Sequence, residues 1–152
     1  MANNHTAGAA ARTFAPSELC QRMLAKTSKG TCGPCILYLE DGTIFYGRAC
    51  GAEGTETGEV CFNTSLEGYF EVMTDPSYAG QIVTMTYPQI GNYGIDETDV
   101  QSAFPGDAVR PASAPAMRGM IVRDMCATPS NWRSAVSVPE YLRAHGIVAI
   151  EG

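Results

Sequence analysis

The fold is decided by residues 58–88, which read GEVCFNTSLEGYFEVMTDPSYAGQIVTMTYP. In Glu59–Asn63 the side chains alternate with a period of two, which predicts a β-strand. Val83, Met85 and Tyr87 lie on one face of a second predicted strand, because successive side chains of a strand point to opposite faces. In the segment between the two strands, the apolar residues recur at the spacing of a helix, so a strand–helix–strand unit is expected.

The predicted helix carries four apolar residues at helical spacing, namely Leu66, Tyr69, Phe70 and Met73. Thr64 and Glu67 are spaced as a capping box, which places the start of the helix at Thr64. Gly68 costs a helix about 1 kcal/mol relative to alanine, so a short helix is expected. Pro76 ends it, because the residue before a proline is disfavoured in the α region.

Upstream, a β-hairpin is predicted from Ile36–Leu39 and Thr43–Arg48, which flank the turn signal Asp41-Gly42. A loop over Gly51–Gly58 then leads into the strand at Glu59–Asn63.

Downstream, residues 91–117 contain six glycines and prolines, which predict a long loop. Met120–Val122 follows as a candidate buried strand, and Ile147–Ile150 as a further one. Between them, Ser137 and Glu140 form a second capping box. The side chains of that helix that are predicted to face the core are Val138, Tyr141 and Leu142. Gly146 is the signal for its end. Five or more strands with two short helices indicate a mixed, α+β domain.

The 152 residues suffice for one domain. Residues 1–34, which include the amphipathic stretch Pro16–Lys26, are interpreted as a mobile N-terminal extension, and residues 35–152 as the domain. No apolar run reaches the roughly 18 residues of a membrane-spanning helix, and no secretory signal is recognised. A soluble, cytoplasmic protein without membrane contact is therefore expected.

The net charge of −6 is unevenly distributed. Residues 1–35 carry four basic side chains against Glu18, whereas the remainder has six arginines against fifteen acidic residues. An acidic body of this kind repels phosphate backbones, so nucleic acid is not expected as a partner.

Two cysteines, Cys32 and Cys35, form a Cys-Gly-Pro-Cys motif of the kind found in thioredoxin-type oxidoreductases. There the first cysteine opens a helix, which lowers its thiol pKa, whereas here a predicted strand follows. Redox catalysis and half of a zinc site are thus minor alternatives to a chance pair. Cys50 and Cys61 are interpreted as small core residues.

The two histidines, His5 and His145, are not placed to activate a cysteine nucleophile. His145 is predicted to cap the C-terminus of a helix. Taken alone, the residues predict no self-sufficient active site.

Four linked blocks carry a resemblance to a known family: residues 39–43 (LEDGT), 58–65 (GEVCFNTS), 68–78 (GYFEVMTDPSY) and 81–92 (QIVTMTYPQIGN). In that order and spacing they resemble the N-terminal domain of the carbamoyl-phosphate synthase small subunit. Residues 118–124 and 141–150 continue the resemblance, which runs from about Ile36 to Gly152.

The resemblance implies a layered β/β/α domain of the swivelling type. In this family the small subunit hydrolyses glutamine and passes ammonia to a large subunit, which uses ATP and Mg to make carbamoyl phosphate for arginine or pyrimidine biosynthesis. The Cys-His-Glu catalytic residues belong to a C-terminal glutaminase domain, so no catalytic residue, metal or cofactor is expected in this chain. Ser77, in the Asp-Pro-Ser-Tyr block, is implied as this domain's contact with glutamine.

The sequence departs from the family pattern in residues 1–34, which are additional, and in a longer loop between Gly94 and Arg118. It also lacks the family's aspartate–threonine–arginine continuation after Gly152. Two hypotheses therefore stay open. One is an assembly domain that acts with a glutaminase domain and the large subunit, and the other is an interaction module that keeps the fold without the chemistry. The first predicts a contiguous apolar patch on the surface.

Overall fold

The computed structural model describes residues 33–95, 115–130 and 136–152. Its elements are β1 (Pro34–Tyr38), β2 (Ile44–Ala49), β3 (Glu59–Asn63), α2 (Tyr69–Thr74), the 3-10 helix η1 (Pro76–Tyr78), β4 (Gln81–Met85), β5 (Gln89–Ile90), β6 (Gly119–Val122), β7 (Asp124–Met125), α3 (Val138–Ala144) and β8 (Val148–Glu151). The predicted amphipathic stretch Pro16–Lys26 lies outside the described residues. The domain boundary at residue 35 stays a prediction, and β1 begins one residue before it.

Six strands form one mixed sheet in the order β1-β2-β8-β6-β4-β3. Strands β3, β4, β6 and β8 are parallel to one another, whereas β2 is antiparallel to β8 and to β1. Strands β5 and β7 form a separate parallel pair. A mixed sheet with few helices confirms the α+β class.

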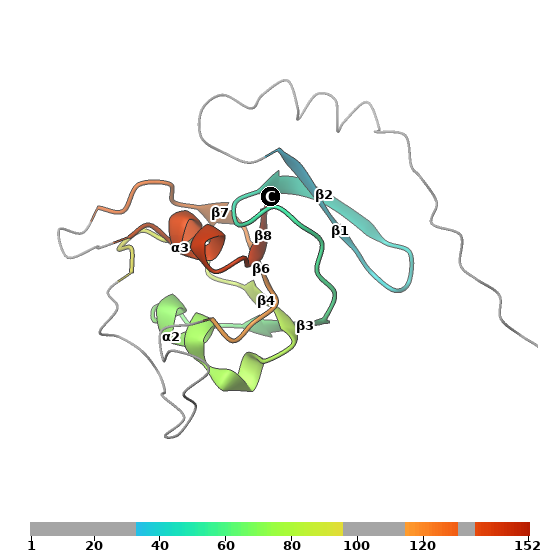
Figure 1. The fold of residues 1–152 in the computed structure, drawn as a ribbon, viewed down its shortest axis with the longest axis horizontal. Helices are drawn as coiled ribbons and strands as arrows, with labels where there is room; N and C mark the ends of the chain where they lie inside the picture. Colours follow the sequence, from blue (N-terminus) through green and yellow to red (C-terminus); the bar gives the residue numbers. More distant parts are fainter. Residues whose placement is uncertain (1–32, 96–114, 131–135) are drawn as a thin grey trace, which may run out of the picture.

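The helices lie on one side of this sheet. Each parallel connection moves the chain one strand further in the same direction, from β3 to β4, β6 and β8. Because such crossovers are almost always right-handed, α2, which follows β3, and α3, which precedes β8, fall on the same face. Figure 1 shows α2 and α3 together on one side, with the β1–β2 hairpin projecting away from them. Among the described residues, the opposite face of the sheet is therefore left without a helix.

The core lies between the sheet and this helical layer. Its sheet residues are Val83, Met85, Met120, Val122 and Ala149, and its helix residues include Phe70, Met73, Tyr141 and Leu142. The predicted inward faces of β4 and α3 are thus confirmed, although β4 ends at Met85 and Tyr87 packs from the turn that follows. Cys50 is buried as predicted, whereas Cys61 is only half-buried.

The predicted β1–β2 hairpin is confirmed. Its strands pair in antiparallel register from Tyr38 opposite Ile44 outward. The Asp41 carboxylate accepts a hydrogen bond from the Thr43 N–H at 2.8 Å, and Gly42 takes a φ of 90°, which a side chain would disfavour.

The predicted start of the first helix at Thr64 is wrong. Helix α2 begins at Tyr69, after Gly68 at a φ of 75°, and no side chain caps it from the preceding residue. The Tyr93 hydroxyl instead accepts hydrogen bonds from the N–H groups of Gly68 and Tyr69, at 2.8 and 3.3 Å. Leu66, one of the four apolar residues at helical spacing, is 71% exposed and lies outside the helix. The proline stop is confirmed, and η1, which the sequence patterns did not predict, follows it directly.

The second helix agrees with its sequence signals. Ser137 accepts from the Glu140 N–H, and the Glu140 carboxylate accepts from the Ser137 N–H in return. The Ser137 hydroxyl also donates to this carboxylate, at 2.7 Å, and this bond, followed by the one from the Ser137 N–H, lowers the pKa of Glu140. The chain leaves the helix through Gly146 at a φ of 69°.

The predicted loop at residues 91–117 is ordered at both described ends. Ile95 is fully buried and bridges to Val136, and Met117 is buried in the core. Residues 96–114 lie outside the described residues.

Candidate functional site

Ser77 lies at the centre of η1, between Pro76 and Tyr78, and is exposed. Its N–H donates to the Asp75 side-chain oxygen at 2.8 Å, so that Asp75 caps the turn. Among the described residues no group forms a hydrogen bond with its hydroxyl, which leaves this hydroxyl available to a ligand. Pro76, which was predicted to end the helix, also opens this turn, and the glutamine contact stays a prediction.

Three further hydrogen bonds fix the turn around Ser77. The N–H of Tyr78 donates to the Asp75 carbonyl, and the N–H of Ala79 to the Pro76 carbonyl, both at 3.1 Å. From outside the turn, the Asn63 side-chain amide donates to the Tyr78 hydroxyl at 2.9 Å. The turn that presents Ser77 is therefore anchored to the end of β3.

A pair of stacked tyrosines anchors the helix that leads into this turn. The rings of Tyr69 and Tyr93 lie 4.2 Å apart with an interplanar angle of 21°. Burial, with a smaller contribution from Tyr93, raises the pKa of Tyr69, whose hydroxyl donates to the Gly94 carbonyl at 2.6 Å. The sequence contains no signal for this pair, because its members are far apart in the chain.

Neither Cys35 nor Cys61 has the environment of an activated thiol. Cys35 lies in β1 rather than at a helix N-terminus, and burial raises its thiol pKa. Cys32, its partner in the motif, lies outside the described residues. Burial also raises the pKa of Cys61, whose thiol lies 3.4 Å from the Gln81 side-chain oxygen. A raised thiol pKa is the opposite of what redox catalysis requires.

His145 occupies the C-cap of α3, as predicted, with its ring 4.4 Å from that of Tyr141. His5 lies outside the described residues. The described ranges contain no group of three or more histidine, cysteine or acidic side chains that could hold a metal ion. None of their helices is long and apolar enough to cross a membrane.

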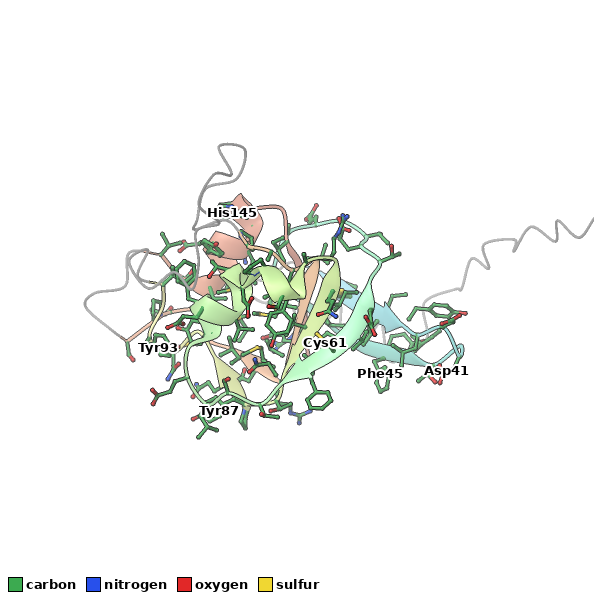
Figure 2. All side chains as sticks on the ribbon, turned by 90° about the horizontal axis from the view of Figure 1, so that it is seen from below. Asp41, Phe45, Cys61, Tyr87, Tyr93 and His145 are labelled. Carbon is green, nitrogen blue, oxygen red and sulfur yellow. The ribbon has the colours of Figure 1, made fainter. Side chains whose placement is uncertain are left out.

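The helix-free face of the sheet is apolar, and its residues are here called the open face: Leu37, Phe45, Val60, Phe62, Ile82, Ile121 and Ile150. Phe62 is 72% exposed and Phe45 52% exposed. A groove of about 290 Å³ runs along this face between the hairpin and the parallel strands. Figure 2 shows Phe45 on the hairpin, at the opposite end of the molecule from Tyr93 and His145. An apolar patch of this kind is what the assembly hypothesis predicts.

Comparison with known proteins decides the family. The sequence profile of the family described as carbamoyl-phosphate synthase small chain, CPSase domain, matches residues 37–152. The chain belongs to this family. The match covers every described strand and helix from β2 onward, and it includes Ser77 and all residues of the open face.

Individual carbamoyl phosphate synthase small chains are similar to this chain. The protein of Xanthomonas axonopodis pv. citri is 54% identical over 119 residues, which are 78% of this chain and 28% of the relative. The protein of Solidesulfovibrio magneticus is 53% identical over 117 residues, 77% of this chain and 28% of the relative. The protein of Thermotoga maritima is 51% identical over 117 residues, 77% of this chain and 27% of the relative. The chain thus spans less than a third of the length of these relatives.

Proposed function

We propose that this chain supplies the N-terminal domain of a glutamine-hydrolysing carbamoyl-phosphate synthase small subunit, with a layered arrangement of the swivelling type. The observation that carries the proposal is the family match over residues 37–152, together with about half identity to small chains over 28% of their length. In this role the domain borders the glutamine site and helps to join a glutaminase domain to the large synthetase subunit. It helps to position glutamine and the neighbouring domains, and it supplies no catalytic group.

The proposal assigns Ser77 to glutamine. Its hydroxyl is exposed and has no hydrogen bond with a described residue, while its backbone is held by Asp75. A hydroxyl can donate one hydrogen bond and accept others, which suits the polar groups of an amino-acid ligand. The rest of the glutamine pocket comes from the glutaminase domain.

A chimaera tests this function. Residues 1–152 are fused to the remaining part of the Thermotoga maritima small chain and assembled with the corresponding large subunit. Glutamine-dependent synthesis of carbamoyl phosphate is expected. Ser77→Ala should raise KM for glutamine about two- to tenfold, because one neutral hydrogen bond is lost, and should leave the ammonia-dependent rate unchanged.

The matched control is Ser65→Ala, which removes an exposed serine hydroxyl outside the turn and should leave KM for glutamine unchanged. A chimaera that assembles but uses only ammonia would reject the proposed function. That result would support the alternative, an interaction module without amidotransferase function.

For the open face we propose one occupant, the remaining part of the small chain. The matched region covers only 27–28% of whole small chains, so most of such a protein lies outside it. Ile150 and Gly152 line the groove on this face, next to Val60 and Phe45. Large exposed aromatic and aliphatic side chains lose unfavourable contact with water when such a surface is covered.

Charged substitutions on the open face test this assignment. Phe62→Glu combined with Phe45→Glu should weaken binding of the chain, added in trans, to the remaining part of the small chain at least tenfold, because the charges would have to be desolvated in the interface. Leu66→Glu is the control, since Leu66 is 71% exposed but lies outside the sheet. Binding is measured by titration calorimetry. Unchanged affinity in the double variant would reject the assignment, as would selective loss of binding to the large subunit alone.

A further inference from the structure

Asn63 connects three segments of the chain. It is the last residue of β3, and its carbonyl accepts a hydrogen bond from the Thr86 N–H at 3.0 Å. Its side-chain oxygen accepts from the Ser65 N–H at 2.8 Å, and its side-chain amide donates to the Tyr78 hydroxyl at 2.9 Å. One short side chain thus ties the end of the sheet to the loop before α2 and to the turn after it.

Tyr78 transmits this anchor to its neighbour. Its ring packs against the core, while its hydroxyl is held by Asn63 and its N–H by the Asp75 carbonyl. Ser77 precedes it in the same three-residue turn, and its own N–H is held by Asp75. Because the ring and the backbone of Tyr78 are both fixed, the preceding Cα, and with it the Cα–Cβ bond of Ser77, has little freedom.

We propose that Asn63 is a positioning residue, which holds Ser77 in register for glutamine through the hydroxyl of Tyr78. This inference rests on the proposed function, since it concerns the same contact. The side chain must offer an acceptor and a donor at once, and asparagine offers them on two separate atoms of one short amide. A carboxylate in its place keeps the acceptor for Ser65, and the Tyr78 hydroxyl then donates to it. Asn63→Asp is therefore a conservative rescue variant, and Asn63→Ala removes both bonds.

Hydrogen exchange on the 152-residue chain measures the positioning itself. Tyr78→Phe removes only the hydroxyl, so exchange of the Ser77 and Tyr78 amides should become roughly two- to tenfold faster, as expected for one lost hydrogen bond. Tyr87→Phe is the matched control, because Tyr87 also packs against the core but its hydroxyl forms no hydrogen bond with the described residues. Equal exchange of these amides in the two variants would overturn the inference.

Kinetics of the chimaera measure the consequence for glutamine. Asn63→Ala and Tyr78→Phe should each raise KM for glutamine roughly two- to tenfold with the ammonia-dependent rate unchanged, and the double variant should equal either single one. Asn63→Asp should stay within twofold of the parent. If Asn63 had a purely structural role, its substitution would lower the glutamine-dependent and the ammonia-dependent rates together. That outcome would also overturn the inference.

Ser77→Ala distinguishes the positioning role of Asn63 from the glutamine contact of Ser77 itself. If it raises KM while Asn63→Ala and Tyr78→Phe do not, the role of Asn63 is rejected and the glutamine contact stands. If Ser77→Ala leaves KM unchanged, the glutamine contact is rejected, and the role of Asn63 with it.

Discussion

Replacing Phe70 by alanine is expected to lower the free energy of unfolding by about 3–5 kcal/mol. Phe70 is 2% exposed, and its ring meets that of Tyr141 edge to face at 5.3 Å. It therefore joins α2 to α3 in the centre of the helical layer. The loss of stability has two parts. One is the lost free energy of transferring the ring atoms from water to the core, and the other is the cost of the cavity that remains. Urea unfolding of the 152-residue chain, followed by circular dichroism, measures it.

Phe62→Ala provides the control for the same chemical change. Phe62 lies on the open face and is 72% exposed, so its removal should change stability by less than about 0.5 kcal/mol. Equal losses in the two variants would contradict the placement of the core on the helical side of the sheet.

Replacing Arg48 by methionine is expected to cost about 3 kcal/mol, the low end of the range for leaving a buried charge without its partner. Arg48 contacts Glu151 at 2.8 Å, and the two side chains are 49% and 5% exposed. The substitution keeps the apolar stem of the arginine but leaves the buried carboxylate without its cation. Among the described residues, its remaining partner is then the Met125 N–H, which donates to the same carboxylate at 3.0 Å. The measurement is urea unfolding at neutral pH.

Glu151→Gln gives the reciprocal test. It removes the buried charge and keeps an oxygen that accepts from Met125, while the half-exposed arginine can be hydrated. A smaller cost of about 1 kcal/mol is expected, the worth of one ordinary hydrogen bond. If this variant were as unstable as Arg48→Met, the uncompensated carboxylate would not be the cause of the instability.

The features that the sequence predicted well are local ones. Asp41 and Gly42 define the hairpin within two residues of each other, and Ser137 and Glu140 cap α3 within a single turn. Each signal involves neighbours in the chain, so no knowledge of the tertiary structure is needed to interpret it.

The start of α2 could not be predicted in this way. Thr64 and Glu67 have the spacing of a capping box, but the N–H groups at the start of the helix are satisfied by Tyr93, which lies 24 and 25 residues away in sequence from the donors. Gly68, which weakens a helix interior, adopts a left-handed conformation just before the helix instead. A tertiary contact thus determined the helix boundary.

The candidate site also contains one part that the sequence implied and one part that depends on tertiary contacts. Ser77 was implied by its motif, whereas Asn63 and Tyr78 meet across 15 residues of sequence and only in the folded chain. Alternation along β3 revealed which residues share a face, but the order of the strands was needed to show that this face lacks a helix.

The position of β8 has a consequence for synthesis on the ribosome. Among the described strands, β2 joins the parallel part of the sheet only through β8, by way of Arg48 opposite Glu151 and Ala49 opposite Ile150. About 100 residues must therefore be added to the nascent chain before the hairpin has its partner, which takes roughly 5–20 s at ordinary elongation rates. During that interval the edge of β2 that faces β8 has no partner among the described strands, and such an open edge can pair with other extended chains. Addition of β8 covers this edge but not Phe45 and Tyr38, which stay 52% and 59% exposed in the folded chain.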